Sequence, residues 1–182
     1  MTTNQAAKAA TIKSFPAPAQ LATITDLKPE QVQKITEAIN PLIADAFALY
    51  VKTKNFHWHL SGSHFRDYHL LLDEHADSIF ASIDPLAERV RRIGGTTIRS
   101  ISHVNQLQTI QDDNDEFVSP SQMLQRLMDD NTHIAQAQRA ARYLCDDNND
   151  PATSSILETI IDETERRKWF LFEAIKGMNN TD

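Results

Sequence analysis

Long stretches without glycine constrain the fold of this chain more than any other feature of its sequence. Only 4 of the 182 residues are glycine, and turn-forming residues separate four segments of helix-like apolar periodicity. These segments run over residues 29–59, 63–93, 119–144 and 150–177. Strands would need more frequent turns, so the pattern favours an all-α protein.

The ends of the segments carry helix-boundary signals. A capping residue precedes proline at Ser119-Pro120 and at Asp150-Pro151, which is typical of helix starts. Gly94-Gly95 ends the second segment, and Pro41 predicts a kink within the first. About 25 residues connect the second and third segments, which is long for a bundle, and we expect a short helix there near 97–106.

The sequence predicts one domain. Residues 1–24 lack helical periodicity and are interpreted as a flexible tail whose only charged side chains are Lys8 and Lys13. Residues 25–177 are assigned to a four-helix bundle with one long crossover, which is the ferritin-like arrangement. Residues 178–182 are expected to form a short C-terminal tail.

Composition limits the cellular compartment and the kinds of binding partner that we expect for this protein. No apolar run reaches the roughly 18 residues that a membrane span needs, and the first 20 residues lack the apolar core of a secretory signal. The single cysteine, Cys145, fits a reducing compartment, so a cytoplasmic protein is expected. A formal net charge of -7 disfavours nucleic-acid binding unless a local basic patch exists.

The second segment carries a stripe of possible metal ligands beside its apolar face. On a helical wheel, His69, Asp73, Asp84 and Glu88 lie roughly 60° to 160° from the core residue Leu72. A solvated polar face is the ordinary explanation for such a stripe. Imidazole and carboxylate together nevertheless suit iron, zinc or manganese.

Spacing favours the metal interpretation. His69 with Asp73, and Asp84 with Glu88, are i,i+4 pairs, but about 16 Å of helix separates the two pairs. The point halfway between positions 69 and 88 is also halfway between positions 73 and 84, and it falls between Ser78 and Ile79. A second copy crossing antiparallel at Ser78 and Ile79 would therefore bring the pairs together, twice over, across a two-fold axis.

Residues 52–95 closely resemble the signature of the Dps family, the DNA-binding proteins from starved cells. The matching motif comprises His57-Trp58, Gly62, Phe65, His69 with Asp73, and Asp84 with Glu88-Arg89. Weaker resemblance extends over about residues 25–176. No glutamate is followed three residues later by histidine, which disfavours the di-iron site inside the bundle that other ferritin-like proteins have.

The resemblance implies a hollow dodecamer that oxidises Fe(II), usually with hydrogen peroxide, and stores ferric mineral, protecting the cell from oxidative damage. It implies a di-iron ferroxidase site built from His57, His69 and Asp73 of one subunit and Asp84 and Glu88 of its two-fold neighbour. Zinc or manganese are expected as substitutes. Trp58 and Asp77 are candidates for residues just outside the ligand set.

Several alternatives stay open at this point. A nucleoid-associated, DNA-compacting protein with secondary iron chemistry is the main one, although two lysines are few for a DNA-binding tail. A metal-dependent interaction module, or a shell that binds zinc without turnover, is another. The sequence leaves open the oxidant (peroxide or oxygen), the cellular metal and the number of subunits.

Individual residues carry further predictions. Pro85, beside a proposed ligand, is expected to bend the helix, to adjust Asp84 or to be a tolerated kink. Arg89 is expected to form an ion pair, with Glu165 as the suggested partner. The acidic run 146–150 lines an iron pore in one interpretation and forms a solvated, capped loop in the other. Packing is the expected role of the remaining histidines, which are His59, His64, His75, His103 and His133.

Overall fold

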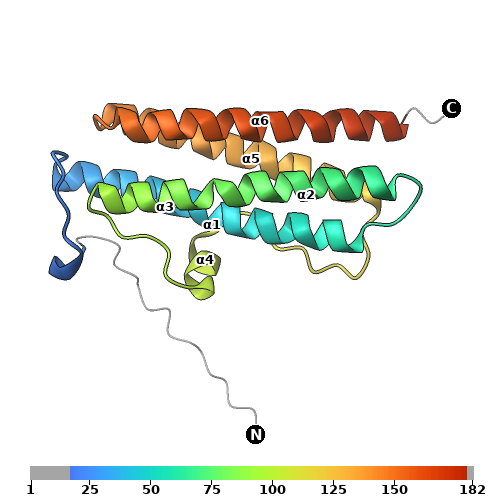
Figure 1. Cartoon of the computed structure of the whole chain (residues 1–182), viewed down its shortest axis with the longest axis horizontal. Helices are drawn as coiled ribbons and strands as arrows, with labels where there is room; N and C mark the ends of the chain where they lie inside the picture. The colour runs from blue at the N-terminus through green and yellow to red at the C-terminus, as the bar shows by residue number, and fades with distance from the viewer. Residues whose placement is uncertain (1–16, 180–182) are drawn as a thin grey trace, which may run out of the picture.

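The computed structural model describes residues 17–179, and these contain helices and loops but no strands. After a 3-10 turn at Ala19–Leu21, the helices are α1 (Pro29–His59), α2 (Phe65–Ala81), α3 (Ile83–Arg92), α4 (Ile101–Leu107), α5 (Pro120–Asp147) and α6 (Pro151–Asn179). Long helices lie side by side as a bundle, and the short helix α4 lies on its flank (Figure 1). The prediction of an all-α four-helix bundle with a short helix in the long connection is confirmed.

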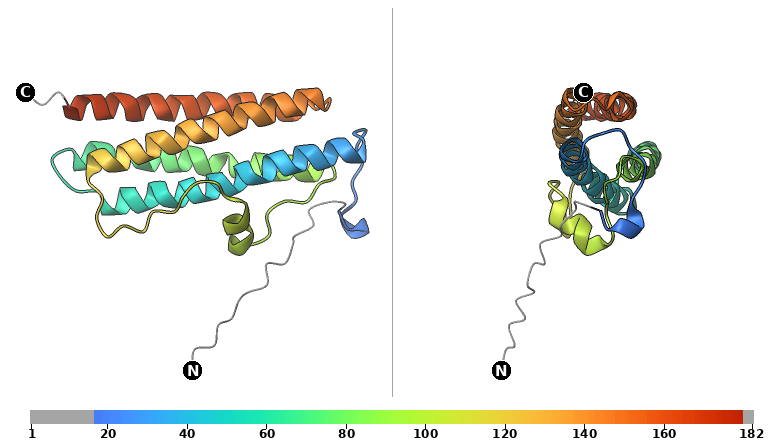
Figure 2. Two further views of the ribbon diagram at one scale, coloured as in Figure 1. Left: turned by 180° about the vertical axis from the view of Figure 1, so that it is seen from behind. Right: turned by 90° about the vertical axis from the view of Figure 1, so that its left-hand side faces the viewer.

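Two helix pairs build the core. The α5–α6 pair packs on the pair formed by α1 with the α2–α3 rod, as the views from behind and along the bundle show (Figure 2). On α1, the fully buried residues recur at helical spacing, beginning with Ile35, Ile39 and Ile43. Leu72 and Leu86 supply the facing layer from the α2–α3 rod, so one apolar stripe per rod meets in the centre.

The predicted single helix over 63–93 is wrong in one detail, because it is two helices. Ser82 separates α2 from α3, and the two continue along the same course (Figure 1). Pro85 explains the break, since it has no N–H to donate to the carbonyl of Ala81. In the observed structure Pro85 stands in the first turn of α3, where a helix needs no such donor.

Other boundaries differ by a few residues. The α1 helix continues unbroken through Pro41, while α4 starts at Ile101 rather than near residue 97. Buried Asp45 of α1 anchors the crossover that follows α4. Its carboxylate accepts hydrogen bonds from the backbone N–H of Thr109 (2.5 Å) and of Ile110 (3.0 Å).

The described part of the predicted tail lies next to α3. The carbonyl of Leu21 accepts a hydrogen bond from Arg91 Nη2 at 2.8 Å. Lys8 and Lys13 lie outside the described residues, as do residues 180–182. No helix in the described range is both long and apolar enough to cross a bilayer.

Candidate metal centre

Two histidines in direct contact with each other form the centre of the candidate site. His57 lies near the end of α1 and His69 in the second turn of α2. Their rings stack with centroids 3.7 Å apart and planes 19° apart. The loop over residues 60–64 turns the chain back on itself and so brings the two residues together.

Backbone carbonyls fix the orientation of both rings. His57 Nδ1 lies 2.8 Å from the carbonyl oxygen of His69, and His69 Nδ1 lies 3.0 Å from that of His57. A carbonyl oxygen only accepts, so each Nδ1 carries the proton and donates it. Each Nε2 is left with a lone pair, which is the arrangement by which proteins prepare histidine to bind a metal.

Asp73 joins the two histidines from the next turn of α2. Its Oδ1 lies 3.8 Å from His57 Nε2, and its side chain is 45% exposed. The structure therefore brings together three of the five predicted ligands within one chain, namely His57, His69 and Asp73.

Lys54 also belongs to this cluster, although no sequence motif predicts it. Its Nζ lies 2.5 Å from Asp73 Oδ1. The hydrogen bond from Lys54 holds the pKa of the Asp73 carboxyl below its usual range, and the same bond raises the pKa of Lys54. Its position in the sequence is consistent with this contact, because Lys54 precedes His57 by one turn of α1 and lies on the same face of the helix.

Asp84 and Glu88 lie elsewhere, on α3. Both are exposed, and Glu88 Oε2 accepts a hydrogen bond from Arg92 Nη2 at 2.9 Å. Across residues 17–179, no three His, Cys, Asp or Glu side chains of one chain are grouped so as to hold a metal ion. The predicted ligands therefore lie in two separate sets on the single chain, and both their metal binding and their pairing across a two-fold axis stay predictions.

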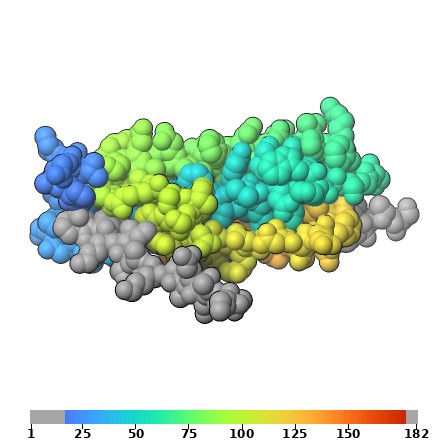
Figure 3. All heavy atoms as spheres, turned by 90° about the horizontal axis from the view of Figure 1, so that it is seen from below, coloured from blue at the N-terminus to red at the C-terminus, as the bar shows by residue number. Residues whose placement is uncertain are grey.

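Trp58 and Asp77, the two residues predicted to lie just outside the ligand set, are on different helices. Asp77 is exposed on α2, and its charge contributes to the raised pKa of Lys54, after the larger effect of the Asp73 hydrogen bond. Trp58 is 64% exposed and lines a groove of about 590 Å³ together with Val51 and Ile101, which are also exposed. On this face, α4 and the crossover lie beside the C-terminal half of α1 (Figure 3). Large apolar side chains gathered on a surface are typical of protein interfaces.

The suggested partner of Arg89 is wrong. Arg89 Nη2 binds Asp150 Oδ1 at 2.5 Å, and Arg89 Nε donates to Thr153 Oγ1 at 2.9 Å. Glu165 instead pairs with Arg139 of α5. Asp150, which directly precedes α6, is buried, and α3 contacts α6. Arg89 therefore links α3 to the N-terminal end of α6.

The acidic run 146–150 contains residues with structural partners. Asp150 is 1% exposed and accepts a hydrogen bond from the backbone N–H of Thr153 at 3.0 Å, which caps α6. Asp146 pairs with Arg142 at 2.7 Å. Cap formation is therefore the observed role of Asp150, and the pore interpretation stays a prediction.

The remaining histidines lie outside the cluster. His75 and His103 are buried. Burial lowers the pKa of both, that of His75 to about 3, with the nearby arginines of α6 as a second cause for His75. The others have local neighbours: His59 contacts the carbonyl of Asn55, His64 the ring of Tyr68 and His133 the hydroxyl of Thr109.

Comparison with known proteins agrees with this fold. A family model described as a ferritin-like domain matches residues 36–180. An uncharacterised low temperature-induced protein of Nostoc is 33% identical over 152 residues, which are 83% of this chain and 85% of the relative. DNA protection during starvation protein 1 of Deinococcus radiodurans is 35% identical over 47% of this chain and 41% of its own length.

The solved structures give the same result. A Dps protein from Vibrio cholerae, described as a member of a superfamily of ferritin-like diiron-carboxylate proteins, superimposes with a TM-score of 0.80 at 26% identity. The match covers 87% of this chain and 99% of that protein. This chain therefore belongs to the ferritin-like family, and Dps proteins are among its sequence relatives and structural neighbours.

Proposed function

We propose that this protein oxidises Fe(II) and stores the ferric product inside a hollow shell of identical subunits. The observation that carries the proposal is the stacked pair His57 and His69, whose Nδ1 atoms are held by carbonyls so that both Nε2 atoms are free to bind metal. The likeness to the Dps protein of Vibrio cholerae, one of the ferritin-like diiron-carboxylate proteins, supports iron as the metal.

Iron is both substrate and cargo in this proposal. His57, His69 and Asp73 of one subunit would meet Asp84 and Glu88 of a two-fold neighbour, giving the mixed nitrogen and oxygen ligands that suit Fe(II), with zinc or manganese as substitutes. Two Fe(II) ions give two electrons to one hydrogen peroxide, which takes up two protons and leaves as two waters. Paired delivery avoids the one-electron product, hydroxyl radical.

Assembly is part of the proposal because one chain holds only part of the ligand set. The exposed apolar side chains Val51, Trp58 and Ile101 line a groove on the α1–α4 face, and Trp58 directly follows His57 in the chain. Burying them against a second copy would stabilise the pairing. We expect the family's dodecamer, located in the cytoplasm.

DNA compaction is the second candidate function. The name of the Deinococcus relative, a DNA protection during starvation protein, supports it, whereas the net charge of -7 opposes it. A gel shift over a salt series separates the two, because phosphate contacts weaken steeply as salt rises. Binding that persists at physiological salt in a protein that does not oxidise iron would put DNA compaction first.

The decisive test is a double variant, His69→Ala with Asp73→Ala. Fe(II) is added without oxygen, peroxide follows, and the ferric absorbance is recorded. Wild type should oxidise iron rapidly into a soluble, protein-bound product, and the variant should lose this fast phase while keeping its assembled size. The matched control is His64→Ala with Asp67→Ala, two exposed residues nearby, which should behave as wild type. Equal rates in wild type and the His69 and Asp73 variant would refute the site.

A further inference from the structure

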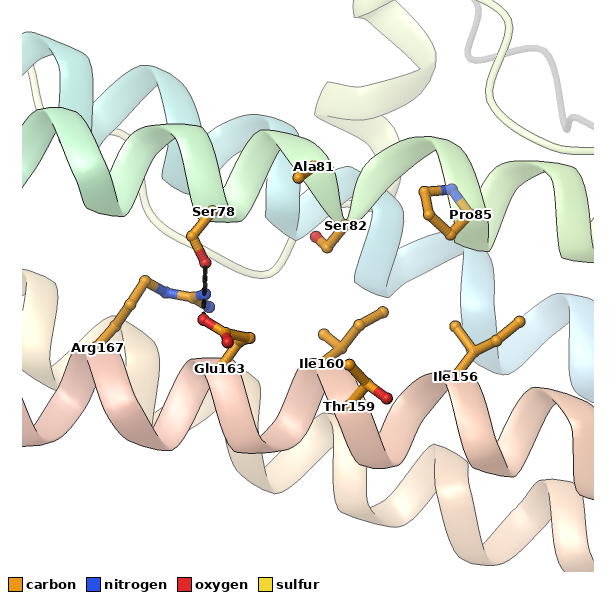
Figure 4. Close-up of a pocket in the computed structure, with 9 residues that line it drawn as sticks. All are labelled: Ser78, Ala81, Ser82, Pro85, Ile156, Thr159, Ile160, Glu163 and Arg167. Carbon is orange, nitrogen blue, oxygen red and sulfur yellow. Dashed lines mark hydrogen bonds between the residues drawn. The ribbon is translucent and has the colours of Figure 1, made fainter.

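A groove of about 480 Å³ lies between the α2–α3 junction and α6, away from the histidine cluster (Figure 4). It exists because one face of the α2–α3 rod carries only small side chains, at Ser78, Ala81, Ser82 and Pro85. Opposite them, α6 presents Ile156, Thr159, Ile160, Glu163 and Arg167. From Ser78 to Pro85 the groove follows about 10 Å of helix.

Arg167, at one end of the groove, is a buried cation with only neutral hydrogen-bond partners. It is 3% exposed. Its Nε donates to Asn131 Oδ1 at 3.1 Å, Nη1 to Ser78 Oγ at 2.9 Å, and Nη2 to Thr164 Oγ1 at 2.8 Å. Three of the five guanidinium N–H groups are thus used, and one is left on each terminal nitrogen.

No carboxylate among residues 17–179 forms an ion pair with Arg167. Glu163 is the acid whose charge acts on it, yet that carboxylate contacts Arg166 Nη1 (3.5 Å) and Ser78 Oγ (3.5 Å) instead. Burial lowers the pKa of Arg167 to about 10, so the side chain is still positively charged at neutral pH. Glu163 partly compensates the charge of Arg167 from the same groove, and with Arg166 also nearby the three side chains leave this end of the groove with a net charge of +1.

A buried charge without a counter-ion is unfavourable, and an anion placed beside it relieves much of that penalty. The two free N–H groups of a guanidinium can form the paired hydrogen bonds that a carboxylate accepts. The rest of the groove is largely apolar, at Ala81, Pro85, Ile156 and Ile160. A bare inorganic anion would leave that apolar surface exposed to water, whereas a hydrocarbon chain would cover it.

We infer that this groove binds a small amphipathic carboxylate, such as a medium-chain alkanoate, with its carboxylate on Arg167 and its hydrocarbon chain along the α2–α3 junction. This inference does not depend on iron oxidation. The ligand would bridge α2–α3 and α6 at the point where the α2–α3 rod is interrupted at Ser82.

Calorimetric titration of the assembled full-length protein with octanoate tests the inference. Octanol, which lacks the charge, and inorganic phosphate, which lacks the hydrocarbon chain, should each bind at least tenfold more weakly. Arg167→Gln should weaken octanoate binding at least tenfold, whereas Arg139→Gln, which removes an equal charge outside the groove, should not change it.

Ala81→Leu gives a second variant that keeps Arg167 and narrows the groove, so the test survives if Arg167→Gln does not fold. Loss of octanoate binding in Ala81→Leu would support the inference. No binding to wild type, equal binding to Arg167→Gln or Ala81→Leu, or phosphate binding as tight as that of octanoate would each overturn it. Iron oxidation is not the readout, so the result is separate from that of the ferroxidase proposal.

Discussion

The two sets of proposed ligands differ in how firmly the fold holds them. His57 and His69 are tied to each other's backbone carbonyls and stacked, and Asp73 is held by Lys54. Glu88 is 59% exposed, and its ion-pair partner within residues 17–179 is Arg92, one turn away. The histidine set is therefore prepared in the single chain, while the α3 set can adjust when a partner arrives. In the proposed ferroxidase, the fixed half would bind Fe(II), and the adaptable half would allow the ferric product to leave.

Mixing two inactive variants tests most directly whether the two ligand sets meet across subunits. His69→Ala/Asp73→Ala lacks one set, and Asp84→Ala/Glu88→Ala lacks the other. When the two variants are dissociated, mixed in equal amounts and reassembled, about half of the two-fold pairs contain one chain of each kind. Each such pair has one intact site out of two, so about a quarter of the wild-type activity should return. Initial Fe(II) oxidation rates measure the recovery. Each variant taken alone through the same procedure should stay inactive, and an inactive mixture would refute a site shared between subunits.

Single substitutions test whether the histidine set and the α3 set contribute differently to activity. His69→Gln should slow Fe(II) oxidation about 100-fold and Glu88→Gln only about tenfold, on the scale by which metal sites respond to lost ligands and their supports. The reason is that water can replace an exposed carboxylate, whereas the space beside His57 is organised around an imidazole. Peroxide-initiated rates under equal Fe(II) loading give both values. Equal losses would show that the two halves are held alike.

Arg89 tests whether α3 depends on its attachment to α6. Arg89→Met leaves buried Asp150 without its ion pair and should lower the free energy of unfolding by about 3 kcal/mol. Arg92→Met, on the same helix but in an exposed pair, should change it by less than about 1 kcal/mol. Urea unfolding monitored by helical circular dichroism measures both. Similar effects for the two variants would contradict an anchoring role for Arg89.

Lys54 gives the smallest expected effect. Its ammonium group occupies Asp73 Oδ1 and repels an incoming cation, so Lys54→Met should strengthen Zn(II) binding about fivefold, as expected for a charge a few ångströms away near the surface. Competition with a chelating dye measures the affinity. Lys34→Met, which removes an exposed charge elsewhere on α1, serves as the control. Weaker binding in Lys54→Met would mean that Lys54 supports the site rather than competing with the metal.

Local sequence signals were enough to predict the helices and the candidate ligands. Apolar periodicity, glycine scarcity and proline after a capping residue are local signals, so the start of α1 at Pro29 and the starts of α5 and α6 were predicted correctly. The i,i+4 spacing of His69 and Asp73 depends only on helix geometry, and the structure places these residues together with His57.

The tertiary structure decided the contacts between residues far apart in the chain. It paired Arg89 with Asp150, 61 positions away, rather than with Glu165. It placed Lys54 on Asp73 and fixed the proton of each imidazole on Nδ1 through a carbonyl of the other helix. It also buried Arg167 out of ion-pair contact with every carboxylate of residues 17–179. Periodicity tells which face of a helix is buried, whereas the approach of two helices determines which polar groups meet there, because hydrogen bonds and ion pairs need atoms within about 3 to 4 Å.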